Sequence, residues 1–301
     1  MKILITGASG FLGQKLAESL LKNKNSLVFV SRNADKTKQK LSLKGDYYSW
    51  DYKKEEFPQK ALKGVDSVIH LMGEGIASGR WNNKRKEEIY NSRILTTRKI
   101  VKALPASVKS FLCSSAVGIY SHSFKQKYTE ETSFNYNGTF LQKTCIDWEE
   151  EALNAKKSSR RVVLLRTGLV LGQAGFLAKM LPVFKAGLGG CIAGGKAYMS
   201  CIHADDWVSA VEFCIQNKKI HGPVNMVSEH PVTNQEFTKT LAKAVRRPAF
   251  FHIPGFVIKI LLGEASRLAL DSQYVIPEKL KKNGFLFKFN NINEALRNLV
   301  A

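Results

Sequence analysis

Three glycines near the start of the chain have the spacing of a phosphate-binding turn. Gly7, Gly10 and Gly13 follow an apolar run at residues 2–6 and open an apolar helical pattern. In such a turn the first glycine lets the chain reverse tightly, the second lets backbone N–H groups approach a pyrophosphate, and the third lets the helix lie close to the strand. A bland α/β turn is the alternative, but the flanking strand and amphipathic helix favour a dinucleotide site.

The end of the second apolar run, at residues 27–30, indicates which dinucleotide would bind. NAD-selective folds usually place a carboxylate here to bind the ribose 2′-hydroxyl. This chain has Ser31 and Arg32 instead, and Asp35 lies further out. An arginine can pair with a 2′-phosphate and stack on adenine, so we predict NADP(H), with NAD(H) as the alternative. In the competing interpretation Arg32 is a solvated surface residue.

Apolar runs of strand length recur along the first half of the chain, with helical patterns between most of them. They lie at 2–6, 26–30, 66–71, 109–114 and 161–166, and the aromatic residues 46–50 are a further strand candidate. This alternation predicts an α/β fold with a doubly wound parallel sheet covered on both faces. The glycine spacing changes near residue 168, so we expect a first domain at 1–167 and a smaller C-terminal substrate lobe at 168–301.

The composition is that of an ordinary globular protein. The 301 residues are 44% hydrophobic and 24% charged, which suffices for a sizeable core. Apolar runs stay well short of the roughly 18 to 20 residues that cross a membrane, and the glycine turn starts too early to leave room for a targeting peptide. We therefore expect a cytoplasmic protein without a membrane partner. Five widely spaced cysteines without a CxxC pair argue against disulfides and against a metal site.

The chain is strongly basic, with 46 Lys and Arg against 25 Asp and Glu and a net charge of +21. The basic residues form short scattered clusters, without an aromatic-interleaved stripe or a basic tail. This distribution argues against specific nucleic-acid binding. We interpret the charge as a solvated surface that also steers anionic ligands toward the protein.

Further segments match a family pattern once the glycine turn is in place. They extend over nearly the whole chain and comprise residues 71–74, Arg80-Trp81, 85–89, 92–94, 115–118, 165–172, 181–182, 187–190, 199–206, 222–225 and 261–264. With them the chain resembles the bacterial branch of atypical short-chain dehydrogenase/reductases, the epimerase family or nucleoside-diphosphate-sugar epimerase-like proteins, which end in a small characteristic C-terminal domain. The resemblance implies a Rossmann-like NAD(P)-binding fold with a substrate lobe, but no particular reaction.

The glycine turn and the resemblance together give an expected cofactor site. Asp51 resembles an adenine-contacting acid of extended members, or else it only starts a turn. Deeper in the cleft the polar candidates include Gly73, Arg93 and Ser114. The expected cofactor-binding set is Gly7, Ser9, Gly10, Phe11, Leu12, Gly13, Ser31, Arg32, Asp51, Leu71, Met72, Gly73, Glu74, Arg93, Ser114 and Arg166.

The usual catalytic pair of this superfamily is missing. Typical members transfer hydride with a Tyr-x-x-x-Lys pair, in which the lysine lowers the pKa of the phenol and a nearby serine orients the substrate hydroxyl. None of the nine tyrosines here is followed by a lysine four residues later. Both residues are replaced in the helix at 140–149, and Ser92 stands where the superfamily has a helix asparagine. Only Ser115 survives, so ordinary dehydrogenase or epimerase turnover is in doubt.

Tyr120 and Glu74 are, beside Ser115, our candidates for the catalytic groups. Each follows a predicted strand at the edge of the sheet where ligands of open α/β folds gather. Tyr120 can instead close a pocket by packing, and Glu74 can instead hydrogen-bond the nicotinamide ribose. Cys145 stands near the vacated lysine position, where a buried structural thiol is favoured over a nucleophile.

Two more segments carry polar side chains with a choice of roles. Arg80 and Trp81 precede a predicted helix at about 84–103, near the nicotinamide end of the cleft. They can grip an anionic or ring-bearing substrate, or they form a plain solvated helix start. His203 precedes a further predicted helix, with Asp205 or Asp206 as its N-cap.

The leading hypothesis is an NADP(H)-binding oxidoreductase or epimerase-like enzyme that acts by hydride transfer on a small polar substrate, nucleotide-linked or anionic. It rests on the glycine turn and on Ser115. The alternative is an NADP(H)-binding regulatory or sensor protein without turnover, which the missing Tyr-Lys pair motivates. A Trp81 ring in an enclosed pocket favours the enzyme, whereas a Trp81 ring on an open flat face favours a partner site.

Overall fold

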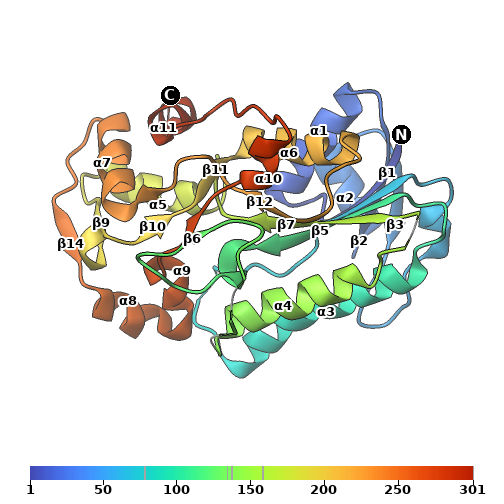
Figure 1. Cartoon of the computed structure of the whole chain (residues 1–301), viewed down its shortest axis with the longest axis horizontal. Helices are drawn as coiled ribbons and strands as arrows, with labels where there is room; N and C mark the ends of the chain where they lie inside the picture. Colours follow the sequence, from blue (N-terminus) through green and yellow to red (C-terminus); the bar gives the residue numbers. More distant parts are fainter. Residues whose placement is uncertain (78, 134, 137, 158, 301) are drawn as a thin grey trace.

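A seven-stranded parallel sheet forms the centre of the computed structural model, which describes residues 1–77, 79–133, 135–136, 138–157 and 159–300. The strand order is β12-β7-β5-β4-β1-β2-β3, and every pairing is parallel (Figure 1). The strands are β1 (Lys2–Thr6), β2 (Ser26–Ser31), β3 (Asp46–Ser49), β4 (Ser67–His70), β5 (Ser110–Ala116), β7 (Arg161–Thr167) and β12 (Gly222–Met226). The predicted strand runs are therefore confirmed, including the short aromatic one.

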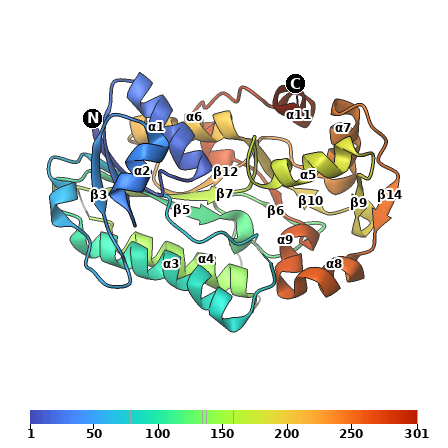
Figure 2. The ribbon, with the colours of Figure 1, turned by 180° about the vertical axis from the view of Figure 1, so that it is seen from behind.

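Helices cover both faces of this sheet (Figures 1 and 2). One face carries α1 (Phe11–Lys22), α2 (Ala34–Leu41) and α6 (Ala204–Gln216), and the other carries α3 (Asn83–Ala103) and α4 (Phe140–Leu153). Successive strand residues point to opposite faces, so Ile3 and Ile5 enter one core cluster and Leu4 enters the other. The result is the predicted Rossmann-like, doubly wound fold.

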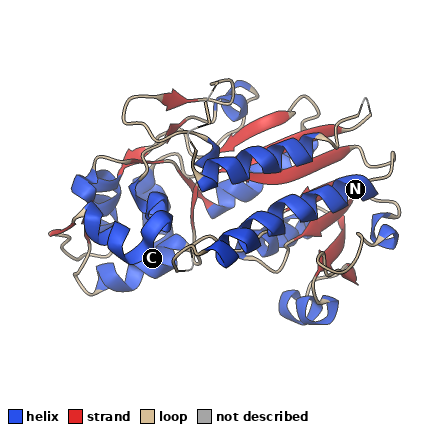
Figure 3. Cartoon of the chain, turned by 90° about the horizontal axis from the view of Figure 1, so that it is seen from below, coloured by secondary structure: helices blue, strands red, loops and turns tan. Residues whose placement is uncertain are grey.

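The later part of the chain builds a smaller lobe from short elements, on the left in Figure 3. Its own core includes Leu177, Phe184, Phe237 and Leu296. Paired short strands, some of them from both halves of the chain, are β6 (Lys127–Tyr128) with β15 (Tyr274–Val275), β8 (Leu169–Leu171) with β11 (Cys201–His203), β9 (Gly190–Ile192) with β14 (Phe251–Ile253), and β10 (Tyr198–Met199) with β13 (Val232–Thr233). The helices of this later part are α5 (Phe176–Lys185), α7 (Asn234–Ala244), α8 (Gly255–Leu262), α9 (Arg267–Leu270), α10 (Glu278–Lys282) and α11 (Ile292–Val300), and its 3-10 turns are η3 (Ala193–Gly195) and η4 (Gly263–Ser266). The 3-10 turns η1 (Gln59–Leu62) and η2 (Val117–Ile119) lie in the first part of the chain.

Strand β12 follows elements of the lobe in the sequence but belongs to the central sheet. Strand β12 pairs with β7 along its whole length, and α6 packs against α1. The Trp207 indole N–H donates to the Thr167 hydroxyl at 3.1 Å, which ties α6 to the end of β7. Strand β12 and helix α6 thus follow residue 167 in the sequence but belong in space to the sheet and its helix layer. The division into domains between residues 167 and 168 stays a prediction.

The start of α6 differs from the prediction. The His203 imidazole caps the helix, since its Nδ1 accepts from the Asp205 backbone N–H at 3.1 Å. Neither aspartate is the N-cap, so that prediction was wrong. The Asp206 carboxylate is instead 2% exposed and accepts from the backbone N–H groups of Lys288 and Phe289 at 2.7 and 2.9 Å. It fastens the C-terminal segment onto α6. Across the described part of the chain, every helix is too short or too polar to cross a bilayer.

A fully buried histidine ends β4 and predicts an acid sensitivity. His70 Nδ1 lies 2.7 Å from the Thr6 hydroxyl, and Nε2 lies 3.1 Å from the Thr97 hydroxyl. Burial, together with the Arg93 charge, lowers the pKa of His70 to about 3. The unfolded chain takes up this proton near pH 6.5, so the folded state loses stability as the pH falls below that value.

We expect His70 alone to lower the free energy of unfolding by about 2 kcal/mol between pH 8 and pH 5. A His70→Gln variant removes this titration, because an amide binds no proton in the range. Urea unfolding at both pH values measures the loss in each protein. Equal losses in wild type and variant would show that His70 is not held neutral.

Candidate functional site

A cavity of about 630 Å³ lies at the carboxyl ends of the central strands, where open α/β sheets bind ligands. The glycine turn and the ends of β4, β5 and β7 form one side of it. The small lobe and residues of α3, α4 and α6 contribute the other walls. Its walls include Gly7, Gly10, Phe11, Leu12, Gly13, Leu71, Met72, Gly73, Arg93, Ser114, Ser115, Tyr120, Leu141, Cys145, Phe176, Met199, Arg267 and Leu268.

The glycine turn has no space for side chains. Gly7 has φ +76°, and a Cβ on it would lie 2.7 Å from the backbone carbonyl carbon of Leu71. A Cβ on Gly13 would lie 2.4 Å from the Gly7 carbonyl oxygen. No side chain caps α1 at Gly10, so the first N–H groups of the helix remain available on the cavity wall. This close packing and the uncapped helix start fit a dinucleotide pyrophosphate.

Cations stand near the turn together with one carboxylate. Arg32, 74% exposed at its side chain, has Nη1 3.8 Å from Glu74 Oε1. Arg85 Nη1 lies 3.8 Å from Glu74 Oε2. The Lys40 ammonium donates to the Ser9 carbonyl at 2.6 Å. A second anion near Arg32 would therefore compete with Glu74 for its guanidinium.

Two other residues of the expected cofactor set make only local contacts. The Ser31 hydroxyl donates to the Asn33 carbonyl at 3.1 Å. The Asp51 carboxylate accepts from the Lys53 backbone N–H at 3.0 Å, which is the geometry of a turn start. Of the expected set, Ser9, Ser31, Arg32, Asp51, Glu74 and Arg166 do not line the cavity. Their contact with a cofactor stays a prediction.

Arg93 of α3 holds the loop after β4 at the cavity wall. Its Nη2 donates to the Glu74 carbonyl at 3.0 Å and its Nη1 to the Ile89 carbonyl at 2.9 Å. The guanidinium carbon lies 5.2 Å from the centre of the Trp148 ring. Burial lowers the pKa of Arg93 from its ordinary value. Ser92, at the helix-asparagine position, accepts from the Glu74 backbone N–H at 2.9 Å and so supports the same loop.

A buried polar network supports Ser115 from behind. The Ser115 hydroxyl donates to Glu149 Oε1 at 2.6 Å. The Arg166 guanidinium is bidentate to the same carboxylate, with Nε to Oε1 at 2.9 Å and Nη2 to Oε2 at 2.8 Å. Burial lowers the pKa of Arg166, but the hydrogen bonds and charge of Glu149 more than reverse this. Arg166 thus orders the network and is linked to the cavity through Tyr120 and, by way of Glu149, through Ser115.

Tyr120 lies at the other end of this network. Its hydroxyl accepts from Arg166 Nη1 at 2.9 Å and lies 2.8 Å from Asn225 Oδ1, to which it donates. Burial raises the pKa of the phenol although the Arg166 charge acts in the opposite direction. The ring lines the cavity, is 2% exposed and stacks on Tyr128 with centroids 4.9 Å apart. The packing role foreseen for Tyr120 is therefore present in the structure.

Apolar or inert groups occupy the helix where the family's tyrosine and lysine are expected. Leu141 and Cys145 of α4 both line the cavity. Burial raises the pKa of the Cys145 thiol to about 12, so it stays protonated at neutral pH. This agrees with the structural interpretation of that cysteine.

Arg80 and Trp81 lie outside the cavity. The Trp81 ring is 8% exposed, donates through its indole N–H to the Ile76 carbonyl at 2.9 Å, and meets Phe140 edge-on. Arg80 Nη2 donates to the Ile260 carbonyl of α8 at 2.6 Å. Trp81 is thus in neither of the two settings expected for it, and both side chains fasten the segment before α3 to the lobe. A direct role in substrate binding stays a prediction.

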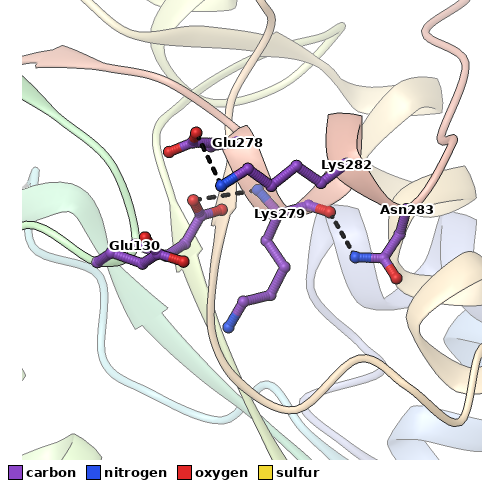
Figure 4. Close-up of a pocket in the computed structure, with 6 residues that line it drawn as sticks. Glu130, Glu278, Lys279, Lys282 and Asn283 are labelled. Carbon is purple, nitrogen blue, oxygen red and sulfur yellow. Dashed lines mark hydrogen bonds and ion pairs between the residues drawn. The ribbon is translucent and has the colours of Figure 1, made fainter.

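A second, smaller hollow of about 190 Å³ lies beside β12 (Figure 4). Glu130 Oε1 accepts from the Asn225 backbone N–H at 2.9 Å, and Oε2 accepts from the Lys279 backbone N–H at 3.2 Å. The Lys279 ammonium donates to the His221 and Pro223 carbonyls at 2.8 and 2.7 Å. These bonds join the edge strand to α10, so the hollow is a structural junction.

Glu149, Asn225 and the lobe residues that line the cavity were not among the predicted site residues. Glu149 lies in α4, the helix that lacks the Tyr-Lys pair, one turn beyond Cys145. Asn225 lies in the segment at 222–225, which matches the family pattern. A carboxylate in an amphipathic helix is ordinarily solvated, so nothing in the helix alone signals its burial. The signal available was the unmatched buried arginine at the end of a strand, which needs an acidic partner.

Comparison with known proteins extends over the whole chain. Residues 3–226 match the NAD dependent epimerase/dehydratase family, and residues 253–299 match a domain of unknown function, DUF1731. The chain is similar to the epimerase family protein ML0860 of Mycobacterium leprae, with 36% identity over 98% of this chain and 94% of that protein. The epimerase family protein YfhF of Bacillus subtilis is 34% identical over 100% and 98% of the two chains.

One solved structure gives a close match over its full length. The human epimerase family protein SDR39U1, crystallised with NADPH, superposes with a TM-score of 0.88 and 28% identity over 100% of this chain and 99% of that one. The glycine turn, the parallel sheet and these matches agree along the entire sequence. The chain belongs to the NAD dependent epimerase/dehydratase family and is an atypical short-chain dehydrogenase/reductase.

Proposed function

We propose that the protein is an NADP(H)-dependent oxidoreductase or epimerase-like enzyme that acts by hydride transfer on a small polar substrate. The observation that carries this proposal is the single cavity that runs from the glycine turn past Ser115 to the lobe. In this proposal a dinucleotide occupies the side of the cavity formed by the glycine turn, and a second small molecule occupies the side formed by the lobe. NADPH in the human relative supports the cofactor.

The network behind Ser115 supplies the acid-base part of this proposal. A bound nicotinamide supplies or accepts hydride. The Ser115 hydroxyl gives its hydrogen to Glu149, which leaves the oxygen lone pairs to accept a hydrogen bond from a substrate hydroxyl. When that hydroxyl is oxidised, its proton passes to the Ser115 oxygen as the serine proton passes to Glu149. Arg166 fixes the carboxylate, and Tyr120 is held neutral by burial. Glu74 remains the alternative base.

The lobe at 168–301 would select the substrate. Its contributions to the cavity are mostly apolar, and Arg267, whose side chain is 42% exposed, is a cation that could meet an anionic group. Arg267 Nη1 already lies 3.4 Å from Asp271, so an anion would bind there in competition with this carboxylate. We therefore propose a small substrate with one polar or anionic end.

Arg32 is expected to set the preference for NADP(H). An Arg32→Ala variant should lose roughly tenfold in NADPH affinity and change little in NADH affinity, because only the 2′-phosphate of NADPH pairs with the guanidinium. Cofactor fluorescence titration measures both affinities. Arg98→Ala, which removes an exposed arginine paired with Glu151, is the matched control. An unchanged ratio of the two affinities would contradict the preference.

Turnover is tested with the purified protein and a panel of substrates. NADPH and NADH are first titrated by fluorescence, and sugar nucleotides and carbonyl compounds are then added to the NADPH complex. Oxidation of NADPH by any of them, lost in Ser115→Ala, supports the enzyme. An NADP(H)-binding regulatory protein is the second candidate, because the chain lacks the usual Tyr-x-x-x-Lys pair. NADPH binding without turnover across the panel would favour it.

A further inference from the structure

The small lobe ends in an exposed apolar surface, which we call the lobe tip. Its side chains come from α5 and the turn after it, from β14 and the residue before it, and from α8. They are Val183, Leu188, Phe250, Phe251, Phe256, Ile260 and Leu261. Phe250 is 79% exposed, Ile260 65% and Phe256 64%. The eight residues of α8 include no buried one, although most of them are apolar. Figures 1 and 2 place α8 and β14 at the end of the molecule remote from β3.

Contacts between its elements make the lobe tip one surface. Strand β14 pairs with β9, which places Phe251 beside Gly190. The Arg247 guanidinium donates to the Lys185 carbonyl at 3.2 Å and so joins the segment before β14 to the end of α5. Helix α8 follows β14 directly, and Phe256 and Ile260, four residues apart, lie on one side of it. These contacts hold the three elements next to one another.

The two stretches of sequence that form the lobe tip contain basic residues but no acidic ones. No Asp or Glu occurs at residues 152–204 or at 237–263, the two stretches that form it. The cations of its elements and of the turn before β14 are exposed: Lys185, Arg246, Arg247 and Lys259. The carboxylates that follow are already paired, Glu264 with Lys86 and Asp271 with Arg267. Among the described residues these four cations form no ion pair with a carboxylate, so unpaired positive charge accompanies the exposed aromatic and aliphatic side chains.

This charge pattern decides between the occupants of such a surface. A second copy of the chain in a symmetric dimer would place the same cations opposite one another, which is repulsive. A membrane surface with anionic headgroups offers negative charge around an apolar interior, and interfacial helices combine bulky apolar side chains with Lys and Arg in this way. The net charge of +21 adds long-range attraction to it.

We propose that the lobe tip docks on an anionic membrane surface. Phe256 and Ile260 enter the boundary between headgroups and acyl chains, while Arg246, Arg247 and Lys259 contact lipid phosphates. This is attachment to a surface, and it departs from the expectation of no membrane partner, which rested on spanning segments. Helix α8 leads through η4 to α9, whose Arg267 and Leu268 line the cavity. Docking would therefore hold the substrate end of the cavity near the lipid.

Vesicle flotation with the full-length protein tests the proposal. The probes are vesicles of phosphatidylcholine alone and of phosphatidylcholine with about one third phosphatidylglycerol, each at low and at high salt. We expect binding to the anionic vesicles only, and weaker binding at high salt. Phe256→Ser/Ile260→Ser and Arg246→Glu/Arg247→Glu should each lower the binding at least tenfold. Leu286→Ser, at an 89% exposed site away from the lobe tip, is the matched control and should bind as wild type.

Other results would overturn the proposal. Equal binding to neutral vesicles would show that the cations do not contribute to the interaction, and binding that survives Phe256→Ser/Ile260→Ser would remove the lobe tip from it. A wild-type dimer in light scattering that Phe256→Ser/Ile260→Ser turns into a monomer, without vesicle binding, would assign the surface to a second copy. Binding to polyglutamate but not to vesicles would assign it to an acidic polypeptide. An unchanged midpoint of thermal unfolding in each variant shows that the fold is intact and keeps this test separate from the proposed function.

Discussion

Gly13→Ala is expected to lower the affinity for NADPH about a hundredfold, or about 2.7 kcal/mol in binding free energy. The added Cβ would lie 2.4 Å from the Gly7 carbonyl oxygen and 2.7 Å from the Ala8 Cα. Both contacts are with backbone, so α1 must move away from the turn. Because the helix start and the turn form one wall of the cavity, this movement disturbs the N–H groups that face the pyrophosphate. Cofactor fluorescence titration measures the loss.

Gly75→Ala is the matched control for this substitution. Gly75 lies in the loop after β4, outside the cavity wall, and a Cβ there has no atom within 4 Å. It should bind NADPH like wild type. Thermal unfolding of both variants shows whether the loss is local. If Gly13→Ala keeps the wild-type affinity in a folded protein, the turn at Gly7 to Gly13 is not the pyrophosphate site.

Glu149→Ala is expected to destabilise the fold by about 3 to 5 kcal/mol, because it leaves the buried Arg166 guanidinium without its bidentate partner. Both side chains are less than 9% exposed, so water cannot replace the carboxylate without opening the core. The Ser115 hydroxyl loses its acceptor in the same variant. Urea unfolding measures the change in the free energy of unfolding.

A double variant separates the charge from the geometry. Glu149→Met/Arg166→Met removes both ions and fills most of their volume, so its stability should return close to that of wild type. It still deprives Ser115 of its acceptor, and turnover should stay low. A loss below about 1 kcal/mol in Glu149→Ala would show that the pair is solvated in solution and does not order the site.

The repetitive part of the fold was predictable from the sequence. A parallel strand buried on both faces needs an almost continuous apolar run, and runs such as Ile3 to Ile5 leave no other interpretation. The glycine turn was predictable for a similar reason, since its backbone contacts exclude a Cβ at Gly13. In both cases a local physical requirement dictates the residue type.

Features that depend on distant contacts were not predictable in this way. The burial of Trp81 depends on Phe140 and on Ala265, which are far away in the sequence. The place of Arg166 behind the cavity depends on Glu149 of α4. The His203 cap replaced an expected aspartate because α6 begins at Ala204, which places both aspartates inside its first turn. The sequence around each of these residues allows several ordinary roles. Contacts with residues far away in the sequence determine which of these roles the residue has.

The late return of β12 to the sheet has a consequence for synthesis on the ribosome. Strand β7 is complete at Thr167, but the strand that covers its outer edge begins only at Gly222. Until then a nascent chain presents an unpaired edge, the kind of edge that recruits other strands. Arg161 at the start of β7 later donates to the Ile215 and Ile220 carbonyls, and its charge meanwhile disfavours a wrong neighbour. Truncation before residue 222 should therefore yield an aggregating product rather than a free-standing cofactor domain.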